Sequence, residues 1–207
     1  MENIIDNFFT IGKSSQIEIR IKGSRFIGMA MPCSTESDAD KLLAEIRKIY
    51  YSATHHCFAY RIGLDWAQAF RYSDAGEPSG TAGKPIYDQI LGKNLTNLII
   101  VVTRYFGGTK LGTGGLTHAY SNAADMAITS AEIIERFIME DLLVAVQYTD
   151  YNIIERMIHK YGGDIIERGM ENQIPSIKMQ LRKSSIGKFK EEAIEKTSGR
   201  VRFGEDS

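Results

Sequence analysis

Isoleucines at every second position from 17 to 21 alternate with polar residues, which is the period of a β-strand. After a glycine turn, a returning strand is predicted over 25–31. Apolar residues then recur at helical spacing from 39 to 49, behind Ser34 and Thr35, either of which can cap a helix. The first fifty residues therefore predict a hairpin followed by a helix.

A continuous apolar and β-branched run over 98–103 is typical of a strand that is buried on both faces of a sheet. We therefore expect this segment at the centre of the first domain. The elements predicted around it are strands over 57–62 and 66–72, joined by a hairpin turn at 63–65, and helices over 85–91 and 115–135.

From about residue 138 the pattern restarts in the order strand, helix, strand, strand, helix, strand. This order predicts a ferredoxin-like domain, with both helices on one face of an antiparallel sheet. The sequence thus predicts an α+β protein with two domains, 1–137 and 138–207. The C-terminal elements are expected at 142–148, 152–161, 164–168, 174–181, 186–196 and 200–203.

Two glycine-rich blocks, 76–85 and 104–115, are each expected to lead into a helix. Glycine allows positive φ and a close approach of the backbone to a partner. The start of a helix presents unpaired N–H groups and the positive end of a dipole. Two such blocks meeting on one face of the domain would favour phosphate or another anion.

Basic side chains accompany both blocks, and Arg and Lys bind phosphate in complementary ways. Aromatic rings beside them suit stacking of single-stranded bases. Two alternatives remain open: Arg104 could pair with Asp74 or Glu77, and Phe106 could belong to the core. The residues assigned to an anion or nucleic-acid site are Arg71, Gly80, Thr81, Lys84, Arg104, Tyr105, Gly107, Gly108, Lys110 and Gly112.

A second group of polar residues is expected to orient the loops or to complete a polar site. Ser79 and Thr81 could cap the helix or contact a phosphate. Adjacent strand residues face opposite sides, so His55 and His56 cannot both point into one site. Zinc needs three or four protein ligands, and we expect no metal and no cofactor. This group comprises His55, Asp74, Glu77, Ser79 and His118.

The composition is that of an ordinary globular protein, with 43% hydrophobic and 25% charged residues in 207. A net charge of -1 does not describe a strongly basic nucleic-acid binder, although a local basic patch can exist within a neutral total. Two cysteines do not make a disulfide framework, and the longest apolar stretch, 98–102, is too short to span a membrane. We expect a cytoplasmic protein without a membrane partner.

The motifs that carry a family resemblance lie between residues 53 and 112. They resemble the IMPACT/YigZ family, and the similarity extends over about 16–130. They are Ala53-Thr54-His55, Ala59-Tyr60-Arg61, Ser73-Asp74, the block from Gly76 to Lys84, Arg104-Tyr105-Phe106-Gly107-Gly108 and Lys110-Leu111-Gly112.

The resemblance implies a first domain similar to domain IV of elongation factor G, which has a ribosomal protein domain-2-like fold, and a second domain similar to domain V. It also implies a partner class. Eukaryotic relatives regulate translation by interfering with activation of a kinase that senses uncharged tRNA. For bacterial members, binding to nucleic acid or the ribosome has been suggested.

Two positions depart from the family pattern. Ala75 stands where a second acidic residue often follows the Asp of the first block. His118 stands where a basic residue often follows the second block, so that local positive charge depends on pH near ~6.5. Both departures weaken a strict transfer of site chemistry.

We favour a non-enzymatic, translation-associated regulator that binds RNA, the ribosome or another phosphate-bearing partner through the two glycine blocks. One alternative is a hydrolase-like enzyme acting on a small phosphorylated or peptidic substrate, using His55, Asp74 and Glu77. The other is a protein-interaction adaptor, which would expose apolar side chains around the loops.

Overall fold

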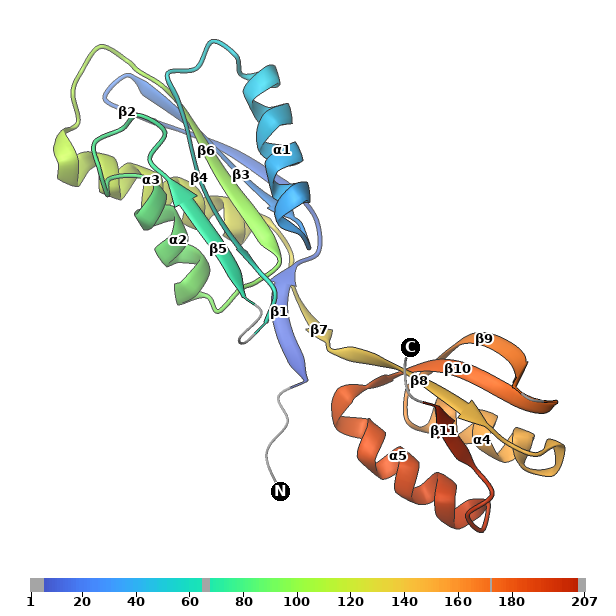
Figure 1. Cartoon of the computed structure of the whole chain (residues 1–207). Helices are drawn as coiled ribbons and strands as arrows, with labels where there is room; N and C mark the ends of the chain where they lie inside the picture. Colours follow the sequence, from blue (N-terminus) through green and yellow to red (C-terminus); the bar gives the residue numbers. More distant parts are fainter. Residues whose placement is uncertain (1–5, 65–67, 172, 205–207) are drawn as a thin grey trace. The chain divides into compact units, whose positions relative to one another are not determined.

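The computed structural model describes residues 6–64, 68–171 and 173–204 (Figure 1). The chain divides into an N-terminal unit, residues 8–136, and a C-terminal unit, which combines residues 137–204 with residues 6 and 7. Both units mix helices with antiparallel sheets, which confirms the predicted α+β class.

The N-terminal unit is built on a five-stranded antiparallel sheet in the order β2-β3-β6-β4-β5. The central strand β6 is buried from Leu98 to Arg104, which confirms the prediction drawn from its β-branched run. The strands are β2 Ser15–Ile21, β3 Ser24–Pro32, β4 His55–Ile62, β5 Ala69–Ser73 and β6 Leu98–Tyr105.

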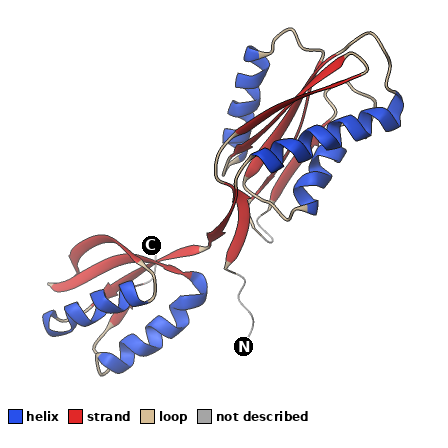
Figure 2. Cartoon of the chain, turned by 180° about the vertical axis from the view of Figure 1, so that it is seen from behind, coloured by secondary structure: helices blue, strands red, loops and turns tan. Residues whose placement is uncertain are grey.

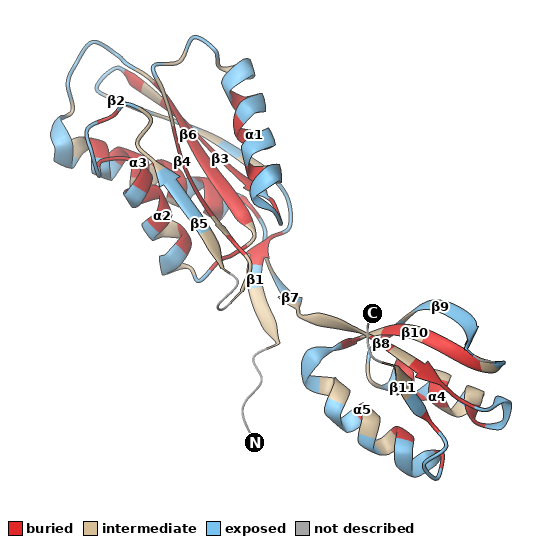
Figure 3. Ribbon diagram, in the orientation of Figure 1, coloured by how far each residue is buried: buried red, intermediate tan, exposed pale blue. Residues whose placement is uncertain are grey.

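Helices cover both faces of this sheet (Figure 2). Helix α1, Glu36–Ile49, packs on one face, and helices α2, Gly83–Gly92, and α3, Gly112–Ser130, pack on the other. Alternate residues of each strand supply the two cores, so that Val101 faces α1 while Val102 faces the other helices. Burial on both faces explains the continuous apolar run of β6, and Figure 3 shows buried residues concentrated there.

Local capping fixes where α1 begins. The Thr35 hydroxyl accepts a hydrogen bond from the Asp38 backbone N–H at 3.1 Å, so Thr35 is the cap and Ser34 is not. The acidic side chains of Glu36 and Asp38 in the first turn also suit the positive end of the helix dipole.

Helix α3 ends at Ser130, earlier than the predicted 135. The next residues form strand β7, Ile133–Phe137, which pairs with β1, Asn7–Ile11, in a two-stranded sheet. Neither strand was predicted. The helical extension was wrong because β-branched Ile133 and Ile134 favour an extended backbone once a pairing partner is present.

The C-terminal unit has the predicted order of elements, and its antiparallel sheet runs β11-β8-β10-β9. The side chains of Val144, Ile154, Ile177 and Phe189 lie in one core between this sheet and its two helices. The elements are β8 Met139–Ala145, α4 Tyr148–Lys160, β9 Asp164–Glu171, β10 Ile174–Arg182, α5 Lys183–Lys196 and β11 Arg202–Gly204.

The elements in the middle of the chain differ in part from those predicted. The turn expected at 63–65 and the strand expected at 66–72 include positions 65–67, which lie outside the described residues. The described part of that strand is β5, which continues to Ser73. Helix α2 begins at Gly83, two residues before the predicted start.

Candidate functional site

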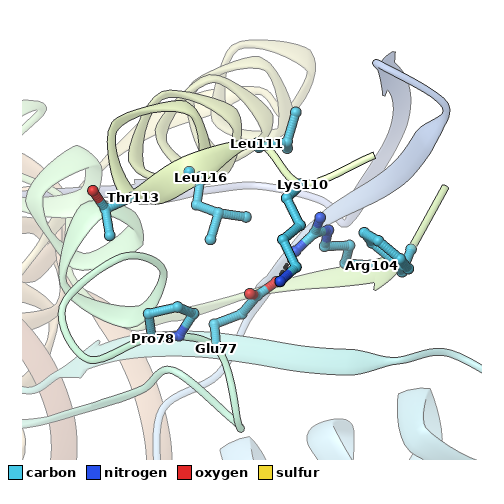
Figure 4. A pocket seen from close by; sticks show the side chains of 9 residues that line it. Glu77, Pro78, Arg104, Lys110, Leu111, Thr113 and Leu116 are labelled. Atoms are coloured by element: carbon cyan, nitrogen blue, oxygen red, sulfur yellow. Dashed lines mark hydrogen bonds and ion pairs between the residues drawn. The ribbon is translucent and has the colours of Figure 1, made fainter. Parts of the chain in front are cut away.

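The two glycine-rich blocks adjoin in space. They line one cavity of about 340 Å³ beside the end of β6 (Figure 4). The first block contributes Glu77 and Pro78, and the second contributes residues from both sides of its glycines together with the first turns of α3. The lining residues are Glu77, Pro78, Arg104, Phe106, Lys110, Leu111, Gly112, Thr113 and Leu116.

A buried ion pair lies at this cavity. Nη1 of Arg104 donates to Oε1 of Glu77 at 2.6 Å, and both side chains are at most 5% exposed. The Tyr120 hydroxyl donates to the same oxygen at 2.7 Å, and Nε2 of His55 lies 3.8 Å from it. Burial raises the pKa of Tyr120 far above its usual range, so its hydroxyl remains a neutral donor. Of the two alternatives left open for Arg104, the structure therefore has the pair with Glu77.

The guanidinium group of Arg104 lies near two aromatic rings, and not all of its hydrogen-bond donors have an acceptor among the described residues. Its guanidinium carbon lies 5.3 Å from the ring centre of Phe26 and 5.5 Å from that of Phe106. Nη2 donates to the Ser24 hydroxyl at 3.2 Å, whereas the buried Nε has no hydrogen-bond partner among the described residues. A buried donor without an acceptor costs about 1–3 kcal/mol, so an acceptor reaching this nitrogen would be favoured.

The first glycine block is closed by its own carboxylate. Asp74 accepts hydrogen bonds from the backbone N–H groups of Gly80, Ala82 and Gly83 at 2.8–2.9 Å. Burial opposes ionisation of Asp74, but these three donors together outweigh it and hold its pKa below the usual value. The first donors of α2 are thus already engaged.

Ser79 and Thr81 do not cap α2, which was one of the two roles expected for them. The Thr81 hydroxyl donates to the Pro78 carbonyl oxygen at 2.7 Å, and Ser79 is exposed. Asp74 caps the helix from nine residues before Gly83, because the chain turns back through positive φ at Ala75, Gly76 and Gly80.

The second block is open, in the sense that no described carboxylate closes it as Asp74 closes the first block. Helix α3 starts at Gly112 without a side-chain cap and without an acidic residue in its first turn. Thr113 in that turn lines the cavity, as does Lys110 just before the helix. Lys110 is exposed and forms no ion pair with any residue that the structure describes. The unengaged positive groups of the cavity therefore come from the second block.

Seven of the ten residues expected at the anion site are not in the cavity lining: Arg71, Gly80, Thr81, Lys84, Tyr105, Gly107 and Gly108. Arg71 is on the opposite face of the sheet, where it lies 5.5 Å from the Phe58 ring centre and 3.6 Å from Asp40 of α1. Tyr105 is on that face too, beneath Arg25. The expected convergence of all four cations is therefore not what the structure has.

Lys84 also lies outside the cavity lining, within the first turn of α2. Its ammonium group contacts both carboxylate oxygens of Asp88 at 2.7 and 2.8 Å, and this hydrogen bonding raises its pKa. Lys84 is thus occupied by a neighbour one turn along the same helix.

The glycines after β6 have different roles. Gly107 packs against the turn between β2 and β3, where an added Cβ would come within 1.9 Å of the Gly23 carbonyl carbon. Gly108 has φ +85° and open space around it. Gly112 has φ +73° and begins α3. Gly107 is therefore required for packing, whereas Gly108 and Gly112 are required for backbone conformation.

His55 and His56 point to opposite faces of the sheet, as expected for adjacent residues of a strand. Nδ1 of His55 lies 2.9 Å from the Ala75 carbonyl oxygen, on the side of the glycine blocks. His56 faces the opposite side, where it contacts the Thr103 hydroxyl at 3.1 Å. His118 is exposed on α3 and is not part of the cavity lining.

The thiol of Cys57, which lies near these residues, is made unreactive by its burial. Sγ of Cys57 donates to the Asp74 carbonyl oxygen at 2.9 Å, and burial raises its pKa to about 12. Within 6–64, 68–171 and 173–204, no three side chains of His, Cys, Asp or Glu gather so that they could hold a metal ion. Among the same residues, no helix is both long and apolar enough to cross a membrane.

Sequence reasoning missed part of the cavity. Phe106 was open to a core assignment, but it is 48% exposed. The apolar wall formed by Pro78, Leu111 and Leu116 was not assigned to any site. Tyr120, within the predicted helix, was not assigned to the site either, yet a buried tyrosine hydroxyl needs a partner and could have indicated the carboxylate.

Comparisons with known proteins bear on identity. Residues 22–128 match the model of the Impact N-terminal domain. An IMPACT family member from Haemophilus influenzae is 34% identical over 199 residues, which cover 93% of this chain and 94% of the relative. IMPACT family member YvyE from Bacillus subtilis is 37% identical over 158 residues, 76% of this chain and 72% of the relative.

One solved structure is similar to this chain over both of its units. The crystal structure of a hypothetical protein matches with a TM-score of 0.72 and 26% identity, over 99% of both chains. The family match includes both glycine blocks, and the relatives extend it to most of the sequence. The chain therefore belongs to the IMPACT family, as its sequence motifs indicated.

Proposed function

We propose that this protein is a translation-associated regulatory protein that binds RNA, alone or within the ribosome, through the cavity between its glycine-rich blocks. The observation that carries the proposal is the uncapped start of α3, which lies at a cavity beside Lys110, a cation without an ion pair among the described residues. Helix starts and lysines both favour phosphate. The link to translation rests on the family resemblance.

Binding is favoured over catalysis because the reactive groups near the cavity are engaged. Oε1 of Glu77 accepts from both Arg104 and Tyr120, so these contacts compete with any contact between this oxygen and a substrate. Cys57 and Tyr120 stay protonated near neutral pH because burial raises the pKa of each. These contacts favour a rigid binding site.

The direct test measures binding of a single-stranded RNA across a range of salt concentrations. Phosphate contacts make the logarithm of the affinity fall linearly with the logarithm of salt concentration, by about 0.7 for each neutralised phosphate. Lys110→Met should lower affinity and reduce the slope. Lys48→Met removes an exposed charge from α1, on the opposite face, and should leave both unchanged.

Two outcomes would contradict the proposal. One is the absence of RNA binding at low salt. The other is an equal loss of affinity in Lys110→Met and Lys48→Met, which would indicate attraction by total charge and no localised site. Sedimentation with ribosomes, before and after nuclease treatment, then separates binding to RNA from binding to protein.

A further inference from the structure

The cavity is suited to a small group and not to a duplex. Its volume of about 340 Å³ is close to the lower end of the range for small-molecule pockets, about 300–1,000 Å³. Pro78, Leu111 and Leu116 give it an apolar wall, and the charged groups occupy a limited part of its lining. A ligand that fits must therefore combine an apolar part with one charged group.

Phe106 supplies a surface for a flat ligand. Its ring lies 5.5 Å from the Arg104 guanidinium carbon and remains 48% exposed. An exposed aromatic ring is a platform on which a nucleobase can stack, and a cation near the ring can add to the attraction. Arg104 itself is held in place by its ion pair with Glu77.

The charges match one terminal phosphate better than an internal one. The Arg104 charge is balanced by Glu77, which leaves Lys110 with one positive charge and the start of α3 with roughly half a charge. A phosphomonoester carries about -1.5 to -2 at pH 7, whereas an internal phosphodiester carries one negative charge. A second and independent indication of a ligand that accepts hydrogen bonds is Nε of Arg104, a residue of the cavity lining, because this buried donor has no acceptor among the described residues.

We propose that the cavity binds a nucleotide through a terminal phosphomonoester, with the phosphate at Lys110 and the first turn of α3 and the base against Phe106. This inference rests on the proposed function and narrows it, because it assigns the site to an end of an RNA strand or to a free mononucleotide. Both sources present the same chemical group.

The experiment compares short single-stranded RNAs of one sequence that carry a 5′-phosphate, a 3′-phosphate or only hydroxyl ends, together with the free nucleoside monophosphates. Affinities are measured by titration calorimetry with the full chain. We expect one phosphorylated end to bind roughly tenfold or more tightly than the hydroxyl end. If the mononucleotides bind and no RNA binds, the cavity recognises a phosphomonoester as proposed, and the proposal that RNA is the partner is overturned.

A substitution in α3 tests the position of the phosphate. Thr113→Asp places a carboxylate in the first helical turn, which suits the helix dipole and therefore preserves folding. It should abolish the preference for a phosphorylated end. Thr117→Asp, on an exposed position about one turn further along the helix, is the matched control and should retain the preference.

A second substitution tests the stacking platform. Phe106→Leu should weaken nucleotide binding roughly fivefold or more, since it removes the ring but keeps an apolar side chain. Phe70→Leu changes a similarly exposed ring on β5, outside the cavity lining, and should have no effect. If RNA binds with normal salt dependence but equally well with every type of end, this inference is overturned while the proposed function stands.

Discussion

The two glycine-rich blocks look alike in sequence, yet one is closed and the other is open. In the first block, Asp74 accepts from three backbone N–H groups and so satisfies the start of α2 within the protein. In the second block, α3 starts without a side-chain cap, next to the cavity. Glycine content alone therefore does not identify an anion site, because what matters is whether a carboxylate of the chain already fills it.

The same difference separates residues that stabilise the fold from residues that are available to bind a ligand. The first block serves mainly as a wall, and it holds Glu77 against Arg104 and Tyr120. The second block carries Lys110 and the first turn of α3, for which the described part of the chain supplies no ion pair and no side-chain cap. Substitutions in the first block, in the Arg104–Glu77 pair and at Gly107 or Gly108 should thus change folding. Substitutions at Lys110 and in the first turn of α3 should change binding with little cost to folding.

The largest effect is expected from Arg104→Met. It leaves the Glu77 carboxylate buried without its cation, and breaking a buried pair in this way costs about 3–5 kcal/mol of unfolding free energy. Urea unfolding followed by circular dichroism measures the loss. The double variant with Glu77→Gln should recover most of it, because both charges are then absent and an amide oxygen can still accept from the Tyr120 hydroxyl. A loss below about 1 kcal/mol in the single variant would show that the pair does not hold the blocks together.

Gly107→Ala is expected to be the next most damaging change. The new Cβ would lie 1.9 Å from the Gly23 carbonyl carbon and 2.2 Å from the Ser24 nitrogen, and both are backbone atoms. We expect a loss of about 3 kcal/mol, at the upper end for overpacking. Gly108→Ala has open space and only an unfavourable φ to overcome, so it should cost about 1–2 kcal/mol. Equal losses in the two variants would contradict the assigned packing role of Gly107.

Asp74→Asn tests the closure of the first block through pH. The pKa of Asp74 is lower in the folded protein than in the unfolded chain, so its carboxylate stabilises the fold above the unfolded value and loses this effect as pH falls through the folded value. At pH 7 the variant should be less stable by about 1–2 kcal/mol. The difference should shrink as pH falls below about 3.9. Unfolding free energies at pH 7 and pH 3 measure it, and a constant difference would contradict the role of the charge.

The smallest effect is expected from Gly114→Ala, and it has the opposite sign. Position 114 lies in the first turn of α3, and an added Cβ there meets no atom within 4 Å. Alanine in a helix is favoured over glycine by about 0.5–1 kcal/mol, so the midpoint of thermal unfolding should rise. A fall in the midpoint would show that the open second block needs glycine at this position for its own conformation.

The fold was predictable where burial imposes a clear period. The run at 98–103 identified the central strand, and the second half of the chain gave its order of elements from periodicity alone. Strands β1 and β7 were missed because each is only 5 residues long and is stabilised by the other, across more than a hundred residues of chain. Local patterns do not contain such a pairing.

The site was predictable only in part. The meeting of the two blocks was expected, and the pair between Arg104 and Glu77 was one of two alternatives. The face on which Arg71 lies depends on strand register, since a shift of one residue reverses it. The capping of α2 by Asp74 depends on positive φ at Ala75, Gly76 and Gly80, and spacing along the sequence does not reveal that geometry.

The pairing of β1 with β7 brings the two points where the chain enters and leaves the N-terminal unit next to each other. Asp6, before β1, belongs with the C-terminal unit, where its carbonyl oxygen accepts from the Ile138 N–H and its carboxylate accepts from the Ser184 hydroxyl. Topologically, residues 8–136 are an insertion into the smaller unit. A fragment that starts at residue 138 would lose these contacts, so one short linker from residue 7 to 137 is the better way to produce the smaller unit alone.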